Sequence, residues 1–483
     1  MSDRLLTLVQ HLKRSGADYA DVRWVRVRTQ RIEARDGRLE GVTSTETAGV
    51  GVRALVRGAW GFAATCSEDA SALRAVCDRA VEVARATAIV SPERVRLSPV
   101  EAHSGSYTSP CAEDPFEVPI GERVDLLKGA VEALRINDAI RGAEGFIEAT
   151  REEKRFLSTE GADLTQTFTY SGSGLTATAV RGDEVQRRSY PADTMGYHTA
   201  AGFEAIRALK LIERAPGVAE EAMALTKAPP CPTGKKTLIL GSHQLALQIH
   251  ESCGHPTELD RALGDEVSLA GGSFLTPDLL GRFRYGSEEV TLVADATCEG
   301  GLGTFGWDDE GVAARKYPLV DRGEFVGYLT SRETSPLLRG YSGPVGGAVR
   351  AQDWSRLPLI RMVNINLEPG DAGSLEDLIA DTKDGILMDA NRAWSIDDLR
   401  LNFKFGCQVA WEIKKGKRTR LLRNPVYEGR TPSFWASCDA VCGESEWKLW
   451  GLPHCGKGEP MQLARVGHGT APARFRKVRV GSK

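Results

Sequence analysis

Hydrophobic residues follow two different spacings along the first part of the chain. Residues 1–16 show helical spacing, which predicts an amphipathic α-helix whose apolar side carries Leu5, Leu6, Val9 and Leu12. Residues 19–66 alternate between apolar and polar positions and are rich in β-branched residues, with turn pairs at Asp36-Gly37 and Arg57-Gly58. We expect a meander of four or five strands there.

Segments with helical spacing then alternate with strand-like segments as far as residue 226. Helical spacing covers residues 68–87, 121–136 and 203–226, whereas residues 139–195 read as strands with turns at Glu160-Gly161 and Gly182-Asp183. The proline- and serine-rich residues 91–119 predict a long surface connection. The first half is therefore expected to be an α+β domain of antiparallel strands with helices.

A change of composition near the middle predicts a domain boundary. The segment KAPPCPTGKK at residues 227–236 combines three prolines with three lysines, as linkers do. Residues 237–240 predict a strand that leads into a helix, and beyond residue 286 the chain reads almost entirely as strand, with one short helix at 374–380. We expect an amino-terminal domain (1–227), a linker (228–236) and a strand-rich, antiparallel or barrel-like carboxy-terminal domain (237–483).

Composition removes several classes of function. The 483 residues include 62 basic and 65 acidic side chains, so the net charge of −3 gives no reason to expect nucleic acid or a membrane surface as a partner. The 51 glycines favour tight turns and a strand-rich fold. No apolar run of membrane-spanning length and no signal peptide is recognisable, and the ten cysteines are irregularly spaced. We expect reduced thiols and a cytoplasmic protein.

The segment HESCGHPTELD holds the chemistry that stands out most. His250 precedes Glu251 directly, and His255 follows five residues after His250, one more than in the common H-E-x-x-H metal motif. On an unbroken α-helix, residues five apart differ by about 140° in direction. Gly254 and Pro256 flank His255, so the helix is expected to end or bulge there and to return His255 toward His250. The pattern predicts a metal site.

A catalytic zinc site needs a third protein ligand and an open position for water. Cys455 is the best candidate, because glycine-rich turns on both sides would expose its sulfur and Lys457 would favour the thiolate. His454 is a rival ligand. Another interpretation groups Cys438, Cys442 and Cys455 in a separate structural zinc site, although the spacing lacks the usual paired knuckles.

These residues resemble the H-E-x-x-x-H signature of the TldD/PmbA metalloprotease family, and the resemblance extends over nearly the whole chain. It includes GVGVRALVRGAWGFAAT early in the chain and, downstream, GTFGWDDEGVAARKYPLVDRGEFVGYLTSRETS, RMVNINLEPG, FKFGCQVAWEIKKGK and CGKGEPMQLARVGHGTAPARFRKV. The resemblance implies a zinc-dependent peptidase of the active type, in which His250, His255 and Cys455 hold Zn²⁺ and Glu251 is the base. It further implies that short or unfolded peptides are cut in a closed chamber inside a dimer.

The roles of other residues stay open at this point. Glu258 and Asp260 are expected either to orient the imidazole N–H groups or to bind a peptide amino terminus. Tyr341 and His454 are candidate oxyanion stabilisers. Strands around residues 361–366 and 402–412 offer possible edges for an extended peptide.

Two functions of different classes follow. The first is a peptidase that cleaves through a metal-activated water, with Glu251 accepting the proton. The alternative is a non-catalytic regulatory or partner subunit whose metal is structural. A homodimer is preferred, and a heterodimer with a paralogue is the second choice.

Overall fold

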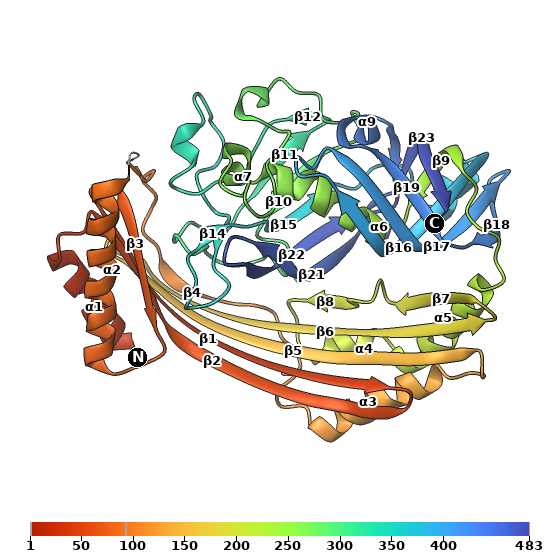
Figure 1. The fold of residues 1–483 in the computed structure, drawn as a ribbon, viewed down its shortest axis with the longest axis horizontal. Coiled ribbons are helices and arrows are strands. Elements are labelled where there is room, and N and C mark those ends of the chain that lie inside the picture. The colour runs from red at the N-terminus through yellow and green to blue at the C-terminus, as the bar shows by residue number, and fades with distance from the viewer. Residues whose placement is uncertain (1, 92–93, 483) are drawn as a thin grey trace.

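A long curved sheet forms the first half of the molecule, and the second half lies over its concave face (Figure 1). The computed structural model describes residues 2–91 and 94–482. Among these residues no strand pairing joins the segment before residue 228 to the segment after 233. Within the described residues, no helix is long and apolar enough to cross a membrane.

The amino-terminal sheet has the strand order β3-β2-β1-β5-β6-β4, and β7 and β8 also pair with β6. Its neighbours are antiparallel except for the parallel pair β4–β6. The elements of this half are α1 (Ser2–Arg14), β1 (Tyr19–Arg35), β2 (Arg38–Val56), β3 (Ala59–Thr65), α2 (Ala70–Val90), β4 (Ser104–Thr108), α3 (Ile120–Ala133), β5 (Ile140–Ser158), β6 (Asp163–Arg181), β7 (Glu184–Tyr190), β8 (Tyr197–Thr199), α4 (Phe203–Ala208) and α5 (Leu211–Leu225).

Three details of the predicted first half are wrong. Residues 19–66 form three long strands rather than four or five, because only the pairs Asp36-Gly37 and Arg57-Gly58 turn the chain back. The stretch 91–119 contributes β4 to the sheet. Leu6 is 43% exposed, and Leu8 takes its place on the buried side of α1.

Two large strand systems and the small two-stranded sheet β13–β14 make up the described second half. The first is a ring made of β16, β9, β23, β19 and β17, which the β16–β17 pairing closes. Because β18 and β20 only extend this ring, this part is a closed barrel. The second is a sheet in the order β12-β11-β10-β15-β22-β21. Helix α6 packs beside β16 and β22. The expected α+β fold, with a strand-rich, barrel-containing second half, is confirmed.

The elements of the second half are β9 (Gly234–Leu240), α6 (Ser242–Ile249), η1 (His250–Gly254), η2 (His255–Thr257), α7 (Leu259–Leu263), η3 (Pro277–Leu279), β10 (Leu292–Asp295), β11 (Lys316–Asp321), β12 (Glu324–Phe325), η4 (Ser335–Leu337), β13 (Val349–Arg350), β14 (Leu359–Ile360), β15 (Asn364–Leu367), α8 (Leu375–Ala380), β16 (Asp384–Ile396), β17 (Asn402–Lys414), β18 (Lys417–Leu422), β19 (Pro425–Arg430), α9 (Thr431–Trp435), β20 (Cys438–Val441), η5 (Glu444–Glu446), β21 (Lys448–Lys457), β22 (Gln462–Thr470) and β23 (Ala473–Ser482).

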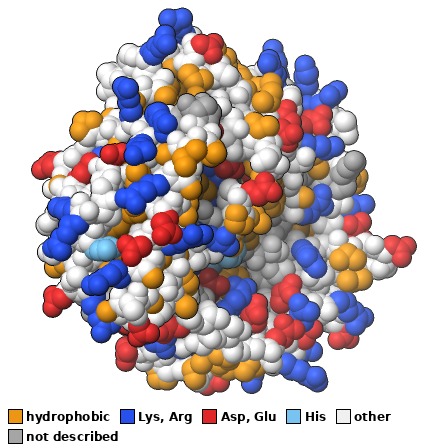
Figure 2. All heavy atoms as spheres, turned by 60° about the vertical axis from the view of Figure 1, so that its left-hand side comes forward, with side chains coloured by type: hydrophobic (Ala, Val, Ile, Leu, Met, Phe, Trp, Pro, Cys, Tyr) orange, Lys and Arg blue, Asp and Glu red, His pale blue; other side chains and the backbone are white. Residues whose placement is uncertain are grey.

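Buried charges join the two halves. Asp309 of the second half accepts hydrogen bonds from Arg23 (3.1 Å) and Lys154 (2.9 Å) of the long sheet. All three side chains are buried, so each charge depends on the others for its stability. On the outer surface, basic and acidic side chains are interspersed around a central hollow (Figure 2), as the near balance of charge predicts.

Candidate metal centre

Helix α6 changes its winding at the two motif histidines. It is α-helical as far as Ile249, continues as the π-helical turn η1 and then as the 3₁₀ turn η2. The backbone N–H of His255 donates to the carbonyl of His250, which is the bond pattern of a π turn. Histidines five residues apart therefore lie one π turn apart and face the same side. The expected bulge is confirmed, although Gly254 keeps right-handed angles (φ −56°, ψ −61°) and not left-handed ones.

Gly254 also allows close packing beneath the bulge. A Cβ atom at this position would lie 2.1 Å from Sδ of Met362, well inside van der Waals contact. Met362 is fully buried between β14 and β15. Because Gly254 has no side chain, the π turn η1 can pack directly against the chain segment between β14 and β15.

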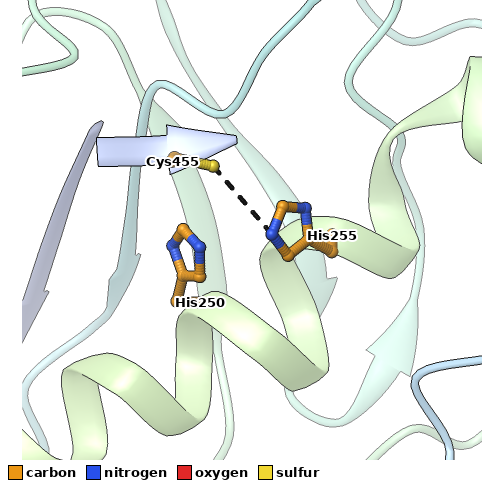
Figure 3. Close-up of side chains that lie close together, drawn as sticks. All are labelled: His250, His255 and Cys455. Carbon is orange, nitrogen blue, oxygen red and sulfur yellow. Dashed lines mark hydrogen bonds between the residues drawn. The ribbon is translucent and has the colours of Figure 1, made fainter. Parts of the chain in front are cut away.

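Three donor atoms of the type that zinc prefers converge at this turn. One ligand atom from each of His250, His255 and Cys455 lies within 4.8 Å of the other two, and all three residues are buried. The sulfur of Cys455 lies 3.9 Å from Nε2 of His255, and Figure 3 shows both rings turned toward it. Two donors bound tetrahedrally to one zinc ion, at about 2.1 and 2.3 Å, would stand ~3.6 Å apart. The donor set and its spacing fit zinc with little adjustment.

Hydrogen bonds fix which nitrogen of each ring faces the shared point. His468 Nδ1 lies 3.1 Å from the carbonyl oxygen of Ile365 and must donate to it, so its Nε2 accepts from His250 Nδ1 at 2.8 Å. His255 Nδ1 donates to Oε2 of Glu258 at 3.0 Å. Both motif histidines therefore keep an unprotonated Nε2, and burial lowers the pKa of each ring, which favours the neutral form.

Glu258 is the carboxylate that orients His255, and it is fully buried. Burial alone would raise its pKa, but Lys457, His255 and Arg261 hold the pKa well below its usual range. Asp260 instead accepts a hydrogen bond from Lys457 Nζ at 2.8 Å. Of the two acids considered from the sequence, only Glu258 contacts a motif imidazole.

Cys455 differs from its expected setting. It lies buried in strand β21 and not in an exposed loop. The register with β22 shifts between Leu452 and Cys455, and such a bulge turns a side chain toward a new direction. Burial raises the pKa of the thiol, but the neighbouring His255 and Arg361 lower it by more, so the net pKa lies below its usual value. The cation that favours the thiolate is therefore Arg361, not Lys457, which pairs with Asp260.

Glu251 lies next to the converging donors and is 5% exposed. Its Oε2 accepts a hydrogen bond from Arg400 Nη1 at 2.9 Å, and Arg400 Nη2 also donates to the carbonyl of Ala270. Oε1 has no hydrogen-bond partner in the described part of the chain. One oxygen of Glu251 is thus fixed, and the other is free for a proton.

Several other expectations are wrong. His454 is exposed and is not part of the donor cluster, and Cys438 and Cys442 do not gather with Cys455 within the described residues. The role of Tyr341 as an oxyanion stabiliser stays a prediction; its side chain lines a surface pocket together with Pro277, Gly281 and Leu338. The strands β15 and β17 have a partner on both sides, so neither offers an open edge for a peptide.

Sequence reasoning missed two residues of the site, His468 and Arg400. His468 stands between two glycines in an apolar strand, which is a weak signal for a buried imidazole with a function. Arg400 belongs to a polar turn between β16 and β17 and carries no signal of its own.

Comparisons with known proteins agree along the whole chain. Residues 20–84, 113–228 and 233–482 match models described as PmbA/TldA metallopeptidase domain 1, central domain and C-terminal domain. The chain is 28% identical over 440 residues to metalloprotease MJ0996 of Methanocaldococcus jannaschii, covering 91% of this chain and 92% of that protein. It is 22% identical over 471 residues to a zinc metalloprotease TldD homolog of Saccharolobus solfataricus, covering 96% and 97% of the two chains.

Solved structures share the fold. TldE from Thermococcus kodakarensis is 18% identical, with a TM-score of 0.74 over 99% of each chain. A Thermotoga maritima protein named as a modulator of a DNA gyrase is 16% identical, with a TM-score of 0.77 over 99% of each chain. Because the carboxy-terminal model alone spans more than half of the sequence, the chain belongs to the PmbA/TldD metallopeptidase family.

Proposed function

We propose that this protein is a zinc-dependent peptidase that hydrolyses short or unfolded peptides in the cytoplasm. The observation that carries the proposal is the convergence of His250, His255 and Cys455 beside the carboxylate of Glu251. Imidazole and thiolate are donors that zinc prefers, and three protein ligands leave a fourth position open for water, as in catalytic zinc sites. The names of the relatives support a metal-dependent protease.

His250, His255 and Cys455 would hold the ion, with His468 and Glu258 orienting the two rings. Bound zinc lowers the pKa of a water ligand toward about 7 and polarises a carbonyl group.

Glu251 acts as the general base in this proposal. Arg400 fixes Oε2, which leaves Oε1 to accept the proton of the attacking water and to pass it to the leaving amine.

The substrate is proposed to bind as an extended strand. Strand β21, which carries Cys455, is the last strand of its sheet, and among the described residues β22 is its one strand partner. Arg361 already donates to the carbonyl of Cys455, so the proposed peptide pairs with the remaining backbone groups of this strand. The cover formed by the amino-terminal sheet in Figure 1 supports a confined site that excludes folded proteins.

We further propose that residues 1–227 form a domain that shapes the chamber and the dimer contact. Residues 228–236 would be the linker, and 237–483 the metallopeptidase domain. The protein would act as a dimer, either of two copies of this chain or of this chain with a paralogue.

The test compares zinc content and cleavage of unfolded peptides for the wild type and Glu251→Gln. The variant should keep its zinc and lose at least a hundredfold in kcat, since a general base contributes roughly 10²–10⁴-fold. Glu144→Gln on the distant sheet, where Glu144 pairs with Arg35, is the matched control and should cleave normally. Unchanged cleavage by Glu251→Gln would contradict its role as the base.

The alternative of a non-catalytic partner subunit predicts a different result. Full zinc content with no cleavage by the wild type, alone or with a paralogue whose own base is removed, would favour it.

A further inference from the structure

A second polar crevice lies between the two halves, on the face of the β21–β22 hairpin that is turned toward the long sheet. Its cavity volume is about 40 Å³, and its lining includes Lys154, Tyr170, Trp307, Arg350 and Arg465. Arg465 follows Ala464, the residue that pairs with Cys455 across the hairpin. The crevice therefore adjoins the candidate metal centre through a single strand pair.

Most charges in the crevice wall neutralise one another. Lys154 lies 2.9 Å from Asp309 and 3.3 Å from Glu152, and Arg23 lies 3.1 Å from Asp309. Two cations and two carboxylates thus balance within this group.

Arg350 and Arg465 are different. Neither forms an ion pair with a carboxylate in the described part of the chain. Arg350 donates from Nη2 to the carbonyl of Met362, and its buried Nε has no partner. Arg465 lies over the ring of Tyr170 at 4.9 Å and donates to Thr150.

Burial lowers the pKa of Arg350, and the nearby carboxylates of Glu152 and Asp309 offset this effect only in part. The hydroxyl of Tyr170, which also lines the crevice, has no hydrogen-bond partner among the described residues. The crevice thus presents two guanidinium groups that form no direct ion pair among the described residues, beside the carboxylates of Glu152 and Asp309 that already bind Lys154.

We propose that this crevice binds a carboxylate of the peptide substrate through Arg350 and Arg465. The proposal rests on the proposed peptidase function. A guanidinium matches the two oxygens of a carboxylate in geometry and charge. A peptide bound beside β21, as proposed above, can reach both faces of the hairpin, the metal on one and this crevice on the other. The carboxylate comes either from the carboxy terminus of the peptide or from an Asp or Glu side chain.

The test measures equilibrium binding of fluorescent peptides to the zinc-loaded Glu251→Gln protein, so that no cleavage is needed. Peptides are compared as free acid and amide at the carboxy terminus, and with Glu or Gln at an internal position. One carboxylate form should bind at least roughly tenfold more tightly than its neutral partner, the size expected for a charged hydrogen bond. The pair that differs identifies the source of the carboxylate.

Arg350→Met should remove this preference and leave the affinity for the neutral peptide and the zinc content unchanged. Arg465→Met, at a partly exposed residue, should weaken the preference and serves if Arg350→Met does not fold. Arg123→Met is the matched control, because Arg123 is a buried arginine that bonds only to Gln30.

Equal affinity for charged and neutral peptides in the parent protein would overturn the proposal, as would a preference that survives both substitutions. Competition by inorganic phosphate without any preference among the peptides would also count against it. A carboxylate preference in a protein that cleaves no peptide would refute the peptidase proposal and leave this site standing.

Discussion

His468 offers a sharp test of the metal centre, because its one hydrogen bond to the three candidate ligands among the described residues is the bond with His250. Its Nε2 accepts the Nδ1–H of His250 at 2.8 Å, and both rings are buried. In His468→Leu the His250 donor loses its acceptor, and an unsatisfied buried donor costs about 1–3 kcal/mol. The ring of His250 is then free to rotate or to change tautomer.

Removing such an orienting partner lowers metal affinity by roughly 10–100-fold in known zinc sites, which corresponds to about 1.4–2.8 kcal/mol. Competition with a chromophoric chelator measures the zinc dissociation constant directly. His468→Gln retains an acceptor and should lose much less affinity than His468→Leu.

The control is His243→Leu. His243 is a buried imidazole on the same helix that packs edge-to-face against Trp450, with ring centroids 5.0 Å apart, and it has no hydrogen bond to His250. Its zinc affinity should equal that of the wild type. A folded His468→Leu protein that binds zinc within twofold of the wild type would refute the proposed orientation of His250.

Three further predictions follow from the packing and the charges. Gly254→Ala places a Cβ atom 2.1 Å from Met362 Sδ. It should therefore lower the free energy of unfolding by about 1–3 kcal/mol in chemical denaturation, and it should weaken zinc binding. A second substitution, Met362→Ala, should restore part of both properties. Burial raises the pKa of Asp309, but Lys154 and Arg23 lower it to about 2. Because this folded value lies below the unfolded value of about 3.9, Asp309 contributes about 2 kcal/mol above pH 5 that is lost as the pH falls toward 2. Asp309→Asn should therefore destabilise the protein at pH 7 by roughly 3–5 kcal/mol and flatten the acid dependence of the unfolding free energy, whereas an unchanged pH profile would contradict the ion pairing. Removal of zinc by a chelator should lower the melting temperature, and excess zinc should restore it, because a ligand that binds the native state stabilises that state. A melting temperature that does not change with zinc would contradict binding to the folded protein.

Much of the fold could be predicted from local sequence signals. The turn pairs Asp36-Gly37 and Gly182-Asp183 marked the ends of long strands, and the short helix predicted at 374–380 is α8, which the hydroxyl of Ser374 caps. Gly254 and Pro256 indicated the altered winding at the motif. These features depend on neighbours only a few residues away.

Features that depend on residues far apart in the sequence could not be predicted from it. The barrel closes by placing β9 parallel to β16, a register that no local pattern specifies. His468 is 218 residues from His250, and Arg400 is 149 residues from Glu251. The bulge that aims Cys455 depends on the pairing of β21 with β22. The sequence therefore pointed to the donor atoms but not to the residues that orient them.

Anomalous diffraction at the zinc edge from crystals of the purified protein tests the central claim most directly. We predict one strong peak per chain, about 2.0–2.1 Å from Nε2 of His250 and of His255 and about 2.3 Å from Sγ of Cys455. A zinc-supplemented crystal with no peak among these three atoms, or with its peak beside Cys438 and Cys442, would contradict the account.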